Sequence, residues 1–186
     1  MASRPLFRSI LAALCVVGTL AAQQPPKARN PIEERLKTAR LDSPEGGDPA
    51  KFGQMRNGNV DLEKPTPEQQ TILDVKAKQL IFPVTHFEYY TTIEATNVEL
   101  TPRTEDKTVT KLVSDLRSQL VVIAPGDSTV PAPKIHFARE FGAAAVRAID
   151  EVLGKGPQPV VRMNAVRMLA VIAESGAPAA TKRVIE

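Results

Sequence analysis

Cysteine is almost absent from this chain of 186 residues, which has Cys15 alone. Cys15 lies in an N-terminal stretch that we interpret below as a cleaved leader, so the mature chain would have no cysteine. Such a chain forms no disulfide and offers no thiolate for a metal, for nucleophilic catalysis or for covalent haem attachment. Its apolar core must therefore stabilise the fold without cross-links.

Histidine is nearly as scarce, with only His86 and His136. His86 stands close to Glu88, but residues two apart do not share a helix face, which argues against a zinc site there. The chain has no Gly-x-Ser-x-Gly elbow and no glycine-rich phosphate loop, and Gly154-Lys155-Gly156 is better interpreted as a helix end. We predict no catalytic residue, cofactor or metal, and keep a small enzyme or metal protein centred on His86 as an alternative.

Tryptophan is absent and aromatic residues make up 4% of the chain. Tyr89-Tyr90 is the one aromatic pair that suggests a binding hot spot, although core packing is the better explanation. No small-molecule ligand is evident.

Neither positive nor negative charge is in large excess. Without Arg4 and Arg8 of the leader, 22 basic side chains stand against 21 acidic ones. The part from Lys134 onward has 8 basic and 5 acidic residues, too mild an excess for a nucleic-acid binder. An anion-binding strip of Arg139, Arg147, Arg162 and Arg167 is conceivable, but solvated faces and pairs such as Arg147 with Glu151 explain these residues better.

Residues 1–22 have the features of an export signal. Arg4 and Arg8 form a basic region, Ser9 to Leu20 is an uncharged apolar run, and small residues ending at Ala22 provide a cleavage site. The run is shorter than the roughly 20 residues of a membrane span. We expect an extracytoplasmic protein, periplasmic or secreted, that contacts a membrane only if the leader is left uncleaved as an anchor.

Residues 23–65 predict a flexible segment with one short helix. Asn30 and Pro31 can begin that helix, which would run to about Arg40. From Leu41 to Pro65 turn signals are dense and apolar residues few, which favours a mobile linker. An ordered loop over the core is the alternative.

Residues 66–186 predict a helical domain. Thr66-Pro67 opens a helix with Ile72, Leu73 and Leu80 on one face, and Pro83 ends it. Thr85 to Glu88 matches a second capping box, so we expect a short helix and then a loop over residues 84–100, with a strand as the alternative.

Three further helices are predicted between Thr104 and the C-terminus, with a fourth beginning at Ala177. Thr104 can cap a helix to Ile123, and two dense amphipathic helices follow at 135–153 and from Pro159 to Ser175. Their apolar faces are formed by Val109, Leu112, Val113, Leu116, Leu120 and Ile123 in the first, Phe137, Phe141, Ala144, Ala145, Ala148 and Val152 in the second, and Val161, Ala165, Met168, Leu169 and Ile172 in the third. The short link between the second and third predicts antiparallel packing.

Small apolar residues are frequent in these helices and permit close helix approach. They include Ala144, Ala148, Ala165, Ala170 and Ala173. Because such residues occupy more than one side of 159–175, we expect this helix to lie in an inner layer, covered on both sides.

The residues Pro159, Val161-Arg162, Ala165, Leu169, Ile172 and Gly176, followed by a second helix, form a pattern that resembles a HEAT-type repeat. The resemblance covers residues 159–186, and Gln158 stands where this family often has an acidic residue. It implies an all-α fold of antiparallel helix pairs stacked as a short α-solenoid, with the helices at 105–123 and 135–153 as an atypical preceding pair.

Solenoids present long surfaces to macromolecules, so we expect a non-catalytic interaction module or scaffold that binds a protein or peptide. The last helix would leave an inner face uncovered, and we expect the chain to continue or to associate. The alternative function is an accessory helical region at the N-terminus of a larger extracytoplasmic enzyme.

Overall fold

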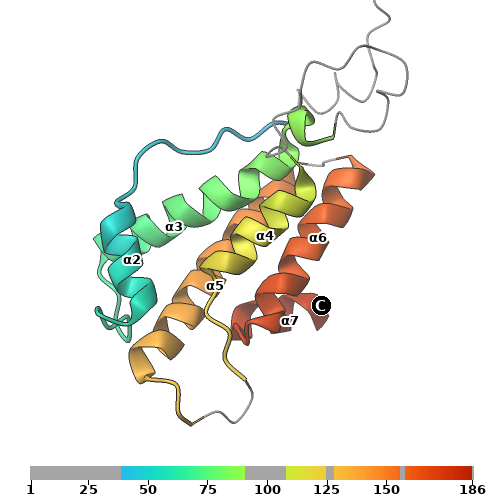
Figure 1. Ribbon diagram of the computed structural model, residues 1–186. Coiled ribbons are helices and arrows are strands. Elements are labelled where there is room, and N and C mark those ends of the chain that lie inside the picture. Colours follow the sequence, from blue (N-terminus) through green and yellow to red (C-terminus); the bar gives the residue numbers. More distant parts are fainter. Residues whose placement is uncertain (1–38, 91–107, 125–127, 156–157, 186) are drawn as a thin grey trace, which may run out of the picture.

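The computed structural model describes residues 39–90, 108–124, 128–155 and 158–185 (Figure 1). The predicted leader at 1–22, the helix beginning at Pro31, the Thr104 cap and the helix-or-strand question for 91–100 lie outside these residues. So do the side chains from Val184 onward.

The described residues form helices and no strand, which confirms the all-α prediction for them. The elements are α2 (Pro49–Asn57), α3 (Pro67–Ile81), the 3₁₀-helices η1 (Phe82–Thr85) and η2 (Phe87–Tyr89), α4 (Val109–Gln119), α5 (Ala132–Gly154), α6 (Pro159–Glu174) and α7 (Pro178–Ile185).

The longer helices pack in two layers. One layer contains α3, α5 and α7, in which α5 contacts both of the others, and the second contains α4 and α6, which contact each other. Between the layers α3 contacts α4, and α6 contacts both α5 and α7. In Figure 1 α5 and α6 run in opposite directions, so the predicted antiparallel packing is confirmed. Helix α2 covers one end of α3 and α5.

Leu41 to Pro65 is ordered, and the prediction of an irregular linker there is wrong. Asp48 accepts a hydrogen bond from the Lys51 amide as N-cap of α2, and Gly58 ends the helix with φ of 80°. Helix α2 buries Phe52 and Met55, and Leu41 and Leu62 on either side of it are buried too. These four large side chains anchor the segment to the core, as the alternative of an ordered cover supposed.

Helix α3 begins and ends where the sequence indicates. The Thr66 hydroxyl accepts from the Gln69 amide and the Gln69 side chain accepts from the Thr66 amide, which is the predicted capping box. Leu73 and Ala77 are buried, and the chain tightens into η1 at Pro83.

Helix α4 is shorter than the predicted 104–123 helix. Its N-cap is Thr108, whose hydroxyl accepts from the Lys111 amide. It ends at Gln119 because Leu120 is extended, with ψ of 145°. The chain then crosses the end of α6, where the Ile123 amide donates to the Ser175 carbonyl at 3.2 Å. Leu120 keeps its predicted buried place, but as the residue that follows the helix.

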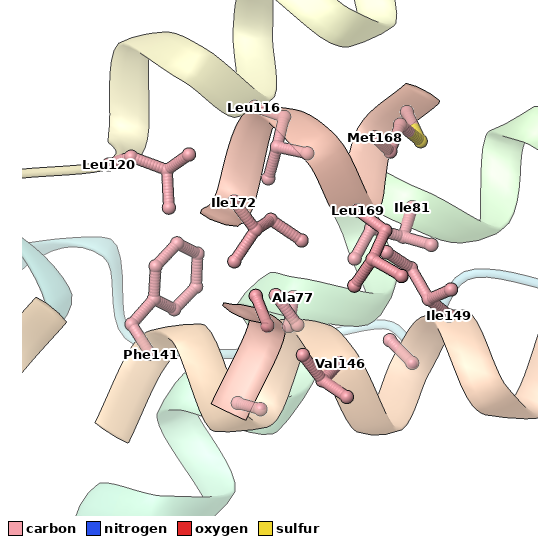
Figure 2. Packing of buried hydrophobic residues seen from close by; sticks show 14 of the residues in the cluster. Ala77, Ile81, Leu116, Leu120, Phe141, Val146, Ile149, Met168, Leu169 and Ile172 are labelled. Atoms are coloured by element: carbon pink, nitrogen blue, oxygen red, sulfur yellow. The ribbon is translucent and has the colours of Figure 1, made fainter. Parts of the chain in front are cut away.

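The predicted apolar faces of α5 and α6 form the core. All six predicted residues of α5 and all five of α6 are buried. Figure 2 shows Leu120, Phe141 and Ile172 converging from three parts of the chain. Helices α5 and α7 meet at Gly142, where a Cβ atom would lie 2.4 Å from Ala177 Cβ.

Candidate interaction surface on helix α6

One side of α6 is exposed and apolar. Met163 and Val166 retain 68% and 54% of their accessible surface, and Ala170 is exposed as well. Positions 163, 166 and 170 fall on one side of a helix, and we call them the α6 stripe. The prediction that neighbours cover α6 on both sides is wrong, because Val161, Met168 and the other core residues lie only on the opposite side.

The sequence pattern does not separate the residues of the α6 stripe from the core residues of the same helix. Met163, Val166 and Ala170 repeat at intervals of three and four, as the core residues do. This second row of apolar residues is the one sign of the stripe in the sequence. A helix with apolar residues on two sides is either buried all round or exposes one row, and the sequence does not distinguish these cases.

The four arginines considered as an anion-binding strip do not act together. Arg139 contacts Glu140 at 2.8 Å and also donates to the Glu63 carbonyl at 3.2 Å. Arg147 pairs with Asp74 on α3 at 2.7 Å, so the expected pair with Glu151 is wrong.

Arg162 and Arg167, by contrast, are exposed on α6, and their side chains form no ion pair or hydrogen bond within the described part of the chain. The third charged residue on the outer side of α6, Glu174, is engaged by Arg117 at 2.7 Å. The α6 stripe is therefore accompanied by two uncommitted positive charges.

The second predicted capping box does not form. The Thr85 hydroxyl accepts from the Leu41 amide at 3.0 Å and donates to the Phe82 carbonyl at 2.8 Å. No side chain caps η2. Thr85 is buried. Its hydroxyl bonds to the backbone of residue 41 and of η1 instead of capping η2, so a long-range contact replaces the expected local capping box.

His86 and Glu88 contact different partners: His86 a backbone carbonyl, and Glu88 an exposed arginine. The His86 Nε2 atom lies 2.8 Å from the Leu41 carbonyl oxygen. Glu88 accepts from Arg40 at 3.2 Å. A hydrogen bond from its own backbone amide, and then the Arg40 guanidinium, lower the pKa of Glu88.

His136 lies near the start of α5, whereas His86 immediately precedes η2, which follows α3 and η1. The two histidines are thus not brought together. Within the ranges that the structure describes, no three His, Cys, Asp or Glu side chains gather in a way that would hold a metal ion.

His136 instead pairs with Asp61, and its Nδ1 atom lies 2.6 Å from Asp61 Oδ1. Asp61 also accepts from the Glu63 amide at 3.0 Å. The His136 hydrogen bond, supported by that amide, lowers the pKa of Asp61. This contact fastens the segment before α3 to the start of α5.

The Asp61 contact predicts a pH-dependent contribution to stability. A lowered carboxyl pKa stabilises the fold above the unfolded pKa of about 3.9, and this contribution is lost as pH falls through the folded pKa. We expect Asp61→Asn to lower the urea midpoint at pH 5, with a difference from wild type that shrinks toward about pH 3. Glu45→Gln, at an exposed residue outside the ion pairs described, is the control. A difference that stays constant across this pH range would contradict the assignment.

One tyrosine of the Tyr89-Tyr90 pair has a structural role. The Tyr90 hydroxyl donates to the Val84 carbonyl at 2.6 Å, and burial raises the pKa of Tyr90 to about 12. Tyr89 is partly buried against the core. This bears out core packing as the better explanation for Tyr90.

A hollow of about 350 Å³ lies between α2 and α3. It is lined by Lys51, Gln54, Met55, Val60, Thr66, Glu68, Gln69 and Ile72. Lys51 and Glu68 form an ion pair of 2.6 Å at its wall, so its charges already satisfy each other. A smaller hollow of about 140 Å³ is lined by Phe52, Gly47 and Val75, among others.

Among the described helices none is long and apolar enough to cross a membrane. No known family model, curated protein or solved structure matches the chain. Among the features described, the α6 stripe and its two arginines are the ones that suggest a function.

Proposed function

We propose that the chain is a non-catalytic interaction module that binds a protein partner through the outer side of α6. The observation that carries this proposal is the exposure of Met163 and Val166 on a helix whose other side is fully packed. Scattered exposed apolar residues are ordinary, but neighbouring ones on a rigid helix provide a ready contact surface.

We further propose that the helices form a short HEAT-like solenoid. The stacking of α4 on α6 and of α5 on α7 supports this, and α6 packs on α7 as a pair, whereas α4 and α5 do not pack closely on each other. The resemblance requires Val161, Ala165 and Leu169 on an inner face, and all three are buried. Gly176, with φ of +84°, makes the turn between the pair. Solenoids present extended surfaces to their partners.

The proposed module acts outside the cytoplasm. This rests on the sequence of residues 1–22, with Arg4 and Arg8 before the apolar run. N-terminal sequencing of the purified protein tests it: a mature chain that begins at or near residue 23 is expected. An intact Met1 in the extracytoplasmic or membrane fraction would mean an uncleaved anchor, and recovery only from the cytoplasm would contradict export.

Partner capture tests the proposed function. The full chain with a C-terminal tag is expressed in its source cells, cross-linked mildly and recovered from the extracytoplasmic fraction. We expect a discrete partner with the wild-type chain and its loss with Val166→Asp. Val122→Asp is the matched control, because Val122 is 68% exposed but lies outside α6. No partner with the wild type, or equal recovery with Val166→Asp, would overturn the proposal.

A further inference from the structure

The outer side of α6 has a charge arrangement that restricts what can cover it. Arg162 precedes Met163 and Arg167 follows Val166, so each arginine lies about 100° around the helix from a stripe residue, on opposite sides. Both arginines are exposed and uncommitted within the described residues. An apolar row with a positive charge on each side is complementary to an apolar row with negative charges on each side.

The dimensions of the stripe fit a helix. Ala170 follows Met163 by seven positions, or about 10 Å along the axis, so the contact covers two turns. Helices recognise such surfaces through residues spaced at i, i+3, i+4 and i+7. From this geometry we infer that the α6 stripe binds a short acidic amphipathic helix of a partner protein, whose carboxylates pair with Arg162 and Arg167. This inference rests on the proposed function and specifies the partner's chemistry.

A second copy of this chain fits less well. A two-fold interface places the same patch on both sides, which would bring Arg162 and Arg167 against their own equivalents. Glu174 offers little compensation because Arg117 already pairs with it. Like charges across an interface are unfavourable, so self-association is disfavoured.

An anionic membrane also fits less well. Interfacial helices insert large residues such as Trp, Phe and Leu, whereas the α6 stripe offers one methionine, one valine and one alanine. Lipid recognition by charge usually needs a cluster of about four to eight basic residues, and only two uncommitted ones are present on this side of α6.

Designed peptides test the inference with the full chain. The probe is an 18-residue helical peptide with a leucine row bordered by glutamates, labelled for fluorescence anisotropy. Its matched control has lysine at every glutamate position. We expect the glutamate peptide to bind roughly tenfold more tightly at low salt, with the preference narrowing as salt is raised.

Two variants separate the contributions of charge and apolar contact. Arg162→Gln with Arg167→Gln is expected to abolish the preference between the peptides, and Val166→Asp to abolish binding of both. All of these side chains are exposed, so thermal unfolding should match the wild type and show that the fold is retained.

Several results would overturn the inference. These are no binding of the glutamate peptide, equal or tighter binding of the lysine peptide, or a preference that survives the double arginine variant. The inference would also be overturned if the chain dimerised by itself or bound phosphatidylserine vesicles and Val166→Asp abolished that dimerisation or binding. In each of these cases the capture of a partner from cells could still depend on Val166. Failure of the peptide experiment is therefore distinguishable from failure of the proposed function.

Discussion

Gly142→Ala is expected to destabilise the protein, although alanine normally favours a helix. The added Cβ would lie 2.4 Å from Ala177 Cβ and 3.8 Å from the Ile172 side chain. Ala177 is buried and its methyl group is attached directly to the backbone, so the start of α7 must move. Overpacking of this kind costs about 1–3 kcal/mol and opposes a propensity gain of about 1 kcal/mol. Urea unfolding should therefore give a net loss of up to about 2 kcal/mol.

Gly53→Ala is the matched control for this variant. Gly53 lies within α2, and nothing stands within 4 Å of the place its Cβ would take. Alanine there should gain about 0.4–1 kcal/mol by restricting the unfolded chain. If both variants were stabilised, α5 and α7 would not approach as closely as described.

Phe141→Ala is expected to have the largest effect of any single substitution considered. Phe141 is fully buried and stacks on Phe137 with ring centroids 5.4 Å apart, while Phe52 of α2 meets it edge-on at 5.3 Å. Its loss removes the ring contacts to α2 and within α5, and Figure 2 shows that its side chain also points toward Leu120 and Ile172. Truncating a buried phenylalanine costs about 3–5 kcal/mol.

Urea unfolding followed by circular dichroism measures this loss. Met163→Ala serves as the control, since Met163 is 68% exposed and truncation there should change stability by no more than about 0.5 kcal/mol. If the two variants lost similar stability, Phe141 would not occupy the centre of the core.

The helices from α5 onward could be predicted because local signals and burial agree there. Pro159 and Gly176 limit α6, and the apolar period of α5 coincides with its buried side. Propensity, periodicity and end signals all favour the same structure in this part of the chain, and such agreement is what specifies a fold.

Elsewhere long-range contacts overrode the local pattern. Few apolar residues between Leu41 and Pro65 suggest a linker, yet four large ones are buried, and one of them, Phe52, packs against rings of α5. Thr85 matched a cap but bonds to residue 41 instead. Helix α4 stops at Gln119 because the chain is drawn across the end of α6. A single sequence shows no such contact in advance.

The candidate surface could be predicted only in part. The sequence groups Arg162 and Arg167 with Arg139 and Arg147 as candidates for binding, whereas in the structure the side chains of Arg139 and Arg147 have partners within the fold. Deciding which arginine is free requires the positions of Asp74 and Glu63 on neighbouring elements. Distinguishing Met163 from Met168 requires knowing which side of α6 faces α5 and α4.

Site-specific photo-crosslinking tests the central claim most directly. A photoreactive residue replaces Met163 in the full chain, in source cells, and Gln70 on the exposed side of α3 provides the comparison. Our account predicts a discrete adduct at position 163 that disappears when Val166→Asp is added, and none at position 70. An adduct at position 70 with none at 163 would contradict it.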